Sequence, residues 1–191
     1  MKVIIVGGVA GGASAAARIR RLDESAQILV LERTGFISYA NCGLPYYVGG
    51  VITDEEDLTL QTPESFWNRF RVDVRVRHEV TAIHPQEKTV AVRDLVTGKT
   101  YEESYDKLIL SPGAKPTRPA MPVIENERIF TLRTVEDTLK VHRFLQPNAP
   151  KSATVIGGGF IGLEMAENLA ELGLEVTLAE SADHLLAPLD F

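Results

Sequence analysis

The sequence predicts an α/β protein in which parallel strands alternate with helices, and three observations support this fold class. A β-branched run, a glycine-rich turn and an alanine-rich segment follow one another over residues 3–21. The same order of strand, turn, helix and strand returns over residues 153–179. Between the two copies, short alternating segments separated by turn residues indicate a small antiparallel meander inserted in the first unit.

The composition excludes several classes of protein. Of the 191 residues, 45% are hydrophobic and 24% are charged, which is ordinary for a globular protein. The formal net charge of −6 gives no general attraction to nucleic acid or to an anionic membrane. No apolar run approaches the roughly 20 residues that span a bilayer, and the N-terminus fits a strand better than a signal peptide. A single cysteine forms no internal disulfide, so we expect a soluble protein of the reducing cytoplasm.

The first glycine turn has the order expected of a dinucleotide site. It follows a strand and opens the predicted helix Ala13 to Arg21, so the backbone can approach a pyrophosphate and the helix N-terminus offers free N–H groups. The next strand, Ile28 to Leu31, ends in Glu32, where a carboxylate would accept ribose hydroxyls. Val9 replaces the middle glycine of G-x-G-x-x-G, and a turn without a ligand is the alternative. The candidate cofactor-binding residues here are Gly7, Gly8, Val9, Ala10, Gly11, Gly12, Glu32 and Arg33.

The middle of the chain supplies a helix, the meander and a connection. Proline at a helix start and aromatics at helical spacing predict a helix over Pro63 to Phe70, with Phe66, Trp67 and Phe70 packed on the core. A strand and small-residue turn end a first domain, residues 1–114. A proline-punctuated linker (115–122) and a helix (134–145), capped by Thr134 with Asp137, make up residues 115–150. The predicted meander strands are Val72 to Val76, Val80 to His84, Thr89 to Val92 and Lys99 to Ser104.

The second glycine turn, Gly157 to Gly162, is a complete G-x-G-x-x-G. A strand (153–156) precedes it, and a helix (163–172) and a strand (175–179) closing on Glu180 follow it. Two copies in this context indicate two dinucleotide sites, although glycines used only for helix–strand packing are an alternative. Residues 151–191 would begin a second dinucleotide-binding domain, left incomplete because a two-stranded sheet is too small to stand alone.

These motifs, with Ser38-Tyr-Ala-Asn-Cys42 and Leu108-Ile-Leu-Ser-Pro-Gly-Ala-Lys-Pro116, resemble the N-terminal part of the pyridine nucleotide-disulfide oxidoreductases. The resemblance covers the whole chain. It implies two Rossmann-like units, with FAD on the first turn and NADH or NADPH on the second. The segment around Cys42 is similar to the single-cysteine branch, above all to coenzyme A-disulfide reductases and rhodanese-fused persulfide reductases.

Two departures separate the branches of the family. Tyr47 stands where the two-cysteine reductases have a second thiol, so oxidised Cys42 must be a mixed disulfide, a persulfide or a sulfenic acid. Ala10 stands where NADH peroxidases and oxidases have a histidine that would polarise a peroxide. We therefore favour reduction of a small-molecule disulfide or persulfide. A peroxidase or oxidase using a Cys42 sulfenic acid is the alternative.

The resemblance also implies roles for individual residues. Electrons would pass from NADH through FAD to a disulfide on Cys42, with Ser38 as a hydroxyl donor beside the thiolate. Cys42 would lie in the first turn of a helix, whose dipole favours the thiolate. Phe160 would cover the flavin, Glu164 would lie near the nicotinamide, and Glu180 would favour NADH over NADPH. The further cofactor-binding candidates are Asn41, Ser111, Gly113, Gly157, Gly159, Phe160, Gly162, Glu164 and Glu180.

Coenzyme A is the expected phosphate-bearing ligand. Arg18, Arg20 and Arg21 share the first helix, and the resemblance assigns Arg18 and Arg21, with Ser38 and Asn41, to the coenzyme A moiety. Arginine suits phosphate because of its fork of donors, whereas a solvated basic face is the alternative. Relatives continue with further domains and form homodimers, so a non-catalytic FAD-binding fragment is the rival from another class. We expect no metal site.

Overall fold

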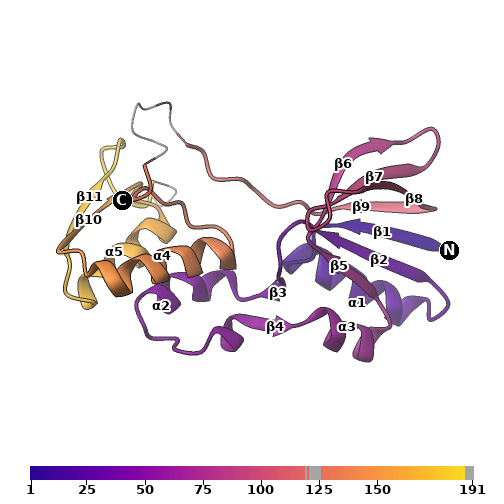
Figure 1. Cartoon of the computed structure of the whole chain (residues 1–191), viewed down its shortest axis with the longest axis horizontal. Helices are drawn as coiled ribbons and strands as arrows, with labels where there is room; N and C mark the ends of the chain where they lie inside the picture. Colours follow the sequence, from indigo (N-terminus) through magenta and orange to yellow (C-terminus); the bar gives the residue numbers. More distant parts are fainter. Residues whose placement is uncertain (119, 121–125, 188–191) are drawn as a thin grey trace. The chain divides into compact units, whose positions relative to one another are not determined.

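The computed structural model describes residues 1–118, 120 and 126–187, which form two compact units (Figure 1). The first unit holds Met1–Tyr39 and Thr59–Ala114, and the second holds Ala40–Leu58 and the residues from Lys115 on. The predicted boundary at residue 114 coincides with a change of unit, but residues 40–58 pack in the second unit. The predicted linker 115–122 lies partly outside the described residues.

A four-stranded parallel sheet forms the centre of the first unit. Its strands are β1 (Lys2–Val6), β2 (Gln27–Glu32), β5 (Asp73–Val76) and β9 (Lys107–Leu110), in the order β5-β2-β1-β9. The prediction that residues 72–76 belong to the meander is wrong, because β5 pairs in parallel with β2. A short alternating run has the same local pattern in either kind of sheet, so its partner depends on distant residues.

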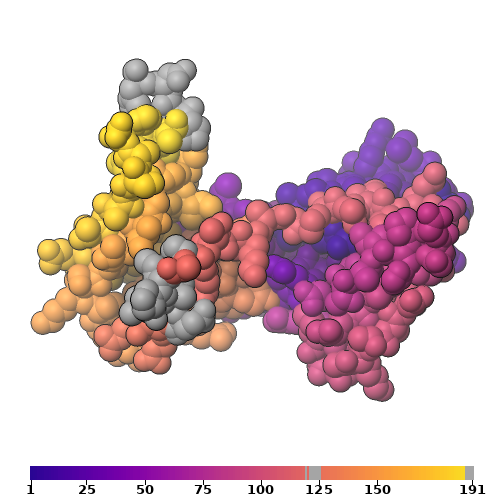
Figure 2. Space-filling view, turned by 90° about the horizontal axis from the view of Figure 1, so that it is seen from above, coloured from indigo at the N-terminus to yellow at the C-terminus, as the bar shows by residue number. Residues whose placement is uncertain are grey.

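Two layers cover this sheet. On one face, Val3 and Ile5 pack with α1 (Ala10–Leu22) and α3 (Pro63–Phe70). On the other, Ile4 packs with the antiparallel meander, whose strands are β6 (His78–His84), β7 (Thr89–Asp94) and β8 (Thr100–Ser104). Figure 2 shows the magenta and pink atoms of the meander at the surface of the first unit. The α/β class with an inserted meander is therefore confirmed.

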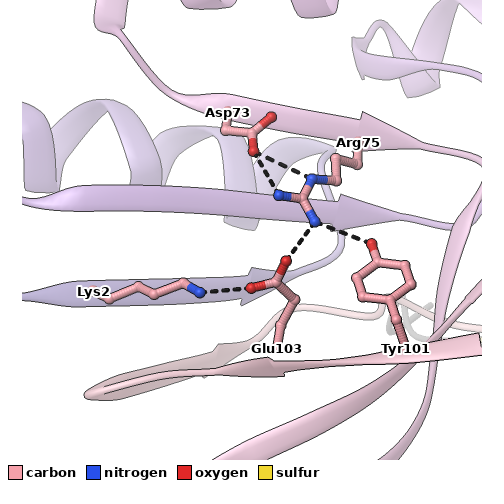
Figure 3. A network of polar contacts seen from close by, with 5 residues as sticks. All are labelled: Lys2, Asp73, Arg75, Tyr101 and Glu103. Atoms are coloured by element: carbon pink, nitrogen blue, oxygen red, sulfur yellow. Dashed lines mark hydrogen bonds and ion pairs between the residues drawn. The ribbon is translucent and has the colours of Figure 1, made fainter.

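A polar network ties the meander to the parallel sheet (Figure 3). Arg75 of β5 pairs with Glu103 of β8 (Nη1 to Oε1, 2.6 Å) and with Asp73 (Nη2 to Oδ2, 3.0 Å), and it donates to the Tyr101 hydroxyl. Lys2 of β1 pairs with the other Glu103 oxygen at 2.6 Å. Burial alone would raise the pKa of Glu103, but hydrogen bonds from Lys2 and Arg75 outweigh it and lower that pKa. The network therefore holds Glu103 ionised between the two layers.

The aromatics of α3 divide between the core and the surface. Phe66 is buried and its ring centroid lies 4.9 Å from that of Phe70, as predicted. Trp67 is 48% exposed, with the Arg71 guanidinium 5.6 Å from its ring, so the expectation that it packs in the core is wrong. A helix of eight residues has one buried stripe, and Trp67 lies outside it.

Residues 40–58, here called the cysteine segment, connect two strands of the first unit along the sequence. These are β3 (Ile37–Tyr39) and β4 (Thr59–Gln61), which pair antiparallel. The backbone N–H of Ala40 donates to the Leu58 carbonyl at 2.9 Å and closes the base of the segment. Within it follow η1 (Asn41–Gly43), α2 (Leu44–Val48) and η2 (Glu55–Leu58).

The second unit packs helices on one face of a two-stranded parallel sheet. Its elements are α4 (Val135–Asn148), β10 (Ser152–Ile156), α5 (Phe160–Glu171) and β11 (Glu175–Ala179). The predicted capping box of Thr134 and Asp137 is confirmed. Val48 of the cysteine segment joins Val141 and Leu169 in the core of this unit.

Both helices after the glycine turns begin three residues earlier than predicted, at Ala10 and Phe160. None of the helices in the described ranges is both long and apolar enough to cross a membrane.

Candidate functional site

The first glycine turn folds into a tight cradle after β1. Gly7 has φ +97° and donates its N–H to the Leu31 carbonyl at 2.9 Å. A Cβ on Gly12 would overlap the Gly7 carbonyl, so α1 can begin this close to the strand only with glycine there. The N–H of Gly8 donates to Glu32 Oε2 at 2.8 Å. The cradle thus joins the end of β1, the start of α1 and the carboxylate that follows β2.

The second glycine turn repeats this geometry. Gly157 has φ +107° and donates to the Ala179 carbonyl at 2.8 Å. A Cβ on Gly162 would overlap the Gly157 carbonyl, and the N–H of Gly158 donates to Glu180 Oε2 at 2.5 Å. Two turns far apart in the sequence therefore share the positive φ of the first glycine, both N–H bonds and the close approach at the last glycine, as the repeat predicted.

The exception at Val9 has a simple conformational explanation. Val9 has φ −93° and its counterpart Gly159 has φ −78°. Negative φ is open to every L-residue, so the middle position needs no glycine for the turn itself. Nothing in the described chain lies within 4 Å of a Cβ on Gly159. The glycine there leaves room next to the backbone for a ligand.

Among the described helices of eight residues or more, capping differs between those that follow a glycine turn and the others. Helices α3 and α4 each have a capping box and acidic residues in the first turn. Helices α1 and α5 have no side-chain cap hydrogen bond and no acidic residue in the first turn. Their N-terminal N–H groups and positive dipole ends therefore face no anion of their own helix, which fits a pyrophosphate at each cradle.

The two acidic residues lie at equivalent places but differ in exposure. Glu32 is buried at 6% exposure and its Oε1 accepts from the Thr34 N–H at 2.8 Å. Glu180 is exposed, and the backbone N–H groups of Ala182, Gly158 and Ser181 lower its pKa to about 2. A carboxylate oxygen has two lone pairs, so each side chain can still accept from a sugar hydroxyl.

Several other candidates of the first unit surround its cradle. Ser38 has φ +46° and donates its N–H to the Gly8 carbonyl at 3.0 Å. The side chain of Ser111 fills the space beside Gly11, and its N–H bonds the Val6 carbonyl at 2.8 Å. Gly113, with φ +70°, lies in the following turn, and the Arg33 side chain is exposed. The left-handed backbone of Ser38 is unusual for a residue with a side chain and marks a constrained position.

Cys42 is exposed and lies in η1, within the second unit. The thiol is therefore accessible from the surface of this unit. As predicted, Cys42 lies in the first turn of a helix, but this turn is the 3-10 helix η1, which runs directly into α2 at Leu44. Pro45 favours a start there, since it has no N–H to donate and suits a first helical turn. With only five residues, α2 contributes a small dipole.

Side chains of α4 and of the segment just before it contact the cysteine segment. Arg133, just before α4, donates from Nη1 to Asn41 Oδ1 at 2.9 Å, so a predicted site residue is bound by an arginine that the motifs did not single out. Tyr47 is buried, and its ring centroid lies 5.0 Å from that of His142. Only the long-range contact reveals Arg133, which lies 92 residues after Asn41.

The three arginines of α1 separate into two groups. Arg20 donates to four backbone carbonyls, those of Phe70, Asp23, Glu24 and Arg71. Arg18 and Arg21 are exposed, and no hydrogen bond or ion pair engages their side chains within the described residues. Arg20 is therefore a structural residue, whereas Arg18 and Arg21 are available to a ligand.

The N-terminus of α5 carries the remaining candidates. Phe160 begins the helix and is 59% exposed, and Glu164, partly buried, lies one turn later. Within the described ranges, no group of three or more His, Cys, Asp or Glu side chains could hold a metal ion.

The comparisons with known proteins agree with this arrangement. Residues 1–190 match the family model described as pyridine nucleotide-disulphide oxidoreductase. Over 184 residues, 96% of the chain, the sequence is 43% identical to a coenzyme A disulfide reductase of Staphylococcus aureus (strain JH9), of which the match covers 41%.

Two solved structures are also similar. Reduced Bacillus anthracis CoADR-RHD has a TM-score of 0.96 at 54% identity, with 99% of this chain and 34% of that chain covered. A NAD-dependent persulfide reductase from A. fulgidus has a TM-score of 0.93 at 38% identity, covering 98% and 35% of the two chains. The chain thus spans less than half the length of these relatives. With two equivalent cradles and a family model that matches nearly every residue, the chain belongs to the pyridine nucleotide-disulphide oxidoreductase family.

Proposed function

We propose that the protein containing this chain is an FAD-dependent NAD(P)H:disulfide oxidoreductase that uses Cys42 as its single redox residue. Its substrate would be a small disulfide or persulfide, coenzyme A disulfide or coenzyme A persulfide in the first place. The names of the similar reductases from S. aureus and A. fulgidus support this substrate class.

The observation that carries the proposal is an exposed thiol without a partner thiol. Cys42 is the only cysteine in the sequence and lies at the surface of its unit. The thiolate would attack one sulfur of R–S–S–R′, forming Cys42–S–S–R and releasing R′–S⁻. Tyr47, buried against His142, stands where a resolving thiol would be needed for an internal disulfide. Since this chain offers no second thiol, the proposal takes the second sulfur from the substrate.

The cradles would divide the cofactors between the units. FAD, bound at Gly7–Gly12 with Glu32 on its ribose, would supply the two electrons that return Cys42 to the thiol, having received them from NADH. The N–H groups at the start of α5 would bind the NADH pyrophosphate. The Glu180 carboxylate would accept from an unphosphorylated ribose and repel a 2′-phosphate, so we propose NADH rather than NADPH.

The exposed arginines of α1 suit a substrate that carries phosphate. Arg18 and Arg21 are exposed on one helix, and their guanidinium groups can bind phosphate oxygens in pairs. Ser38 and Asn41 would contact the same coenzyme A moiety near the thiol. An uncharged disulfide should therefore be a poorer substrate than coenzyme A disulfide.

Mass spectrometry of the single thiol tests the proposal directly. Coenzyme A disulfide should add one coenzyme A moiety to the protein, and the adduct should be absent from Cys42→Ser. The same variant should retain bound FAD, seen by its absorbance, and lose NADH-dependent disulfide reduction. Appreciable disulfide reduction by Cys42→Ser would remove Cys42 from the mechanism.

An NADH oxidase or peroxidase is the second candidate, favoured by a water-forming NADH oxidase from Lactobacillus brevis with a TM-score of 0.91 at 33% identity. It would oxidise Cys42 to a sulfenic acid with peroxide. Position 10, at the start of α1, holds alanine and so offers no acid or base to polarise a peroxide. Comparing the rates of NADH oxidation with coenzyme A disulfide, hydrogen peroxide and oxygen decides between the two.

The assembly and location are part of the same proposal. We place the longer protein in the cytoplasm as a homodimer, which light scattering would test. The rival is a non-catalytic FAD-binding fragment. If the 191-residue chain alone takes up no flavin and no coenzyme A while the longer protein does both, the chain is such a fragment and needs the remaining segments.

A further inference from the structure

Two residues that no motif singled out make an unusually close contact in the second unit. Gly49 ends α2, seven residues after Cys42, and Asn168 lies on α5. A Cβ on Gly49 would overlap the Asn168 amide and would lie 2.7 Å from the Asn168 Cβ. Gly49 has φ −73° and ψ −7°, which any residue can adopt. Close approach, and not backbone conformation, therefore requires glycine at this position.

The Asn168 side chain is buried although one of its polar atoms gains no hydrogen bond within the described chain. It is 1% exposed, and its Nδ2 donates to the Glu164 carbonyl at 2.8 Å. Its Oδ1 has no hydrogen-bond donor among the described residues. A buried acceptor without a donor is unfavourable, whereas an apolar side chain of the same size would avoid that loss. The bond to Glu164 fixes the orientation of the amide and directs its oxygen edge at Gly49.

Asn168 shares its side of α5 with the candidate nucleotide-binding residues. Phe160, Glu164 and Asn168 follow one another at four-residue spacing, so they lie along one face of the helix. The other attachments of the cysteine segment, Asn41 to Arg133 and Tyr47 to His142, lead to α4 and the residue before it. The Gly49–Asn168 contact instead leads from the cysteine segment to the helix that follows the second glycine turn.

We propose that Asn168 is a positioning residue for the redox thiol. Its oriented amide sets how closely α2 lies on α5, and α2 in turn fixes the place of Cys42 relative to the nucleotide-binding end of α5. The advantage of this positioning rests on the proposed function: in a reaction at Cys42, a displacement of about 1 Å can reduce the rate about 100-fold. The contact itself does not depend on the identity of the substrate.

Alkylation of the single cysteine in the 191-residue chain measures the position of Cys42 without cofactor or disulfide. In Gly49→Ala the new methyl group separates α2 from α5, and the iodoacetamide rate at neutral pH should change about threefold or more, because the reactivity of an exposed thiol depends on the groups around it. The rescue is Gly49→Ala with Asn168→Gly, because the Asn168 Cβ also lies too close to the new methyl. The double variant should return to within about twofold of the parent rate.

A second variant decides the matter if Gly49→Ala does not fold. Asn168→Leu keeps the size but loses the bond to Glu164, so its melting temperature should be unchanged or higher while the alkylation rate changes about twofold or more. Thr138→Val is the matched control, because Thr138 is buried and donates to the carbonyl four residues earlier on α4 at 3.1 Å. It should leave the alkylation rate unchanged.

Three outcomes overturn the proposal: unchanged alkylation in folded Gly49→Ala and in Asn168→Leu, an altered rate that Asn168→Gly does not restore, or an equal change in Thr138→Val. Since alkylation requires neither electron transfer nor coenzyme A, failure of the proposed function would leave this test intact.

Discussion

Gly158 donates its backbone N–H to Glu180 Oε2 at 2.5 Å, and this bond joins the second glycine turn to the carboxylate that follows the next strand. Gly8 and Glu32 make the same bond in the first unit at 2.8 Å. Each turn therefore positions an acidic side chain whose Oε2 accepts one hydrogen bond from the turn and keeps a lone pair for a sugar hydroxyl.

Replacement of Glu180 should change the response of the chain to acid. The pKa of this carboxyl is about 2 in the folded chain against an ordinary 4.5. A lowered pKa contributes stability above the unfolded value and loses it as the pH falls through the folded value. Glu180→Gln should therefore lose less stability than the parent between pH 4.5 and about 2. Urea unfolding midpoints across this range measure the difference, and parallel curves would contradict the prediction.

Replacement of two glycines of the second turn by alanine should have different effects, one on stability and the other on NADH binding. Gly162→Ala places a Cβ on the Gly157 carbonyl and should destabilise the fold by about 1–3 kcal/mol. Gly159→Ala meets nothing within 4 Å in the described chain and should change stability by less than about 0.5 kcal/mol. It should still weaken NADH binding about tenfold, since the methyl group occupies the approach of the pyrophosphate. Thermal unfolding and calorimetric titration with NADH of the longer protein check both, and unweakened binding in Gly159→Ala would disprove the assigned approach.

Loss of Arg75 should release the meander from the parallel sheet. Arg75→Met leaves Glu103, whose side chain is 17% exposed, with Lys2 as its remaining cation, and should cost about 1–3 kcal/mol. Arg93→Met, at an exposed position of β7, is the matched control. Because the Glu103 pKa is lowered, its contribution is present above the ordinary value and declines as the pH falls below it. The difference in unfolding free energy between Arg75→Met and Arg93→Met, measured with urea, should be smaller at acidic pH than at neutral pH. A difference that does not change with pH would show that the effect comes from packing.

Replacement of Arg20 should lower stability, whereas replacement of Arg18 or Arg21 should weaken coenzyme A binding. Arg20→Met removes the donor of four backbone carbonyls and should destabilise the chain by about 1–3 kcal/mol. Arg18→Met and Arg21→Met should leave the unfolding midpoint unchanged and weaken coenzyme A binding about tenfold each. Equal destabilisation by all three would mean that Arg18 and Arg21 are structural as well.

Local pattern was sufficient where neighbouring residues determine the structure. The glycine turns, the capping box of Thr134 with Asp137 and the helix Pro63–Phe70 were predicted because each depends on contacts a few residues apart. Strand β5 was assigned to the wrong sheet because four residues of alternating pattern carry no information about their partner.

The repeated dinucleotide unit and the single thiol are properties of residue identity and short-range geometry, so they can be predicted from the residues alone. Three findings needed the folded chain: residues 40–58 pack with the second unit, Arg20 is a structural residue, and Asn168 requires glycine at position 49. Each of these depends on atoms tens of residues apart in the chain, and such contacts are selected by the packing of the whole unit rather than by any local preference.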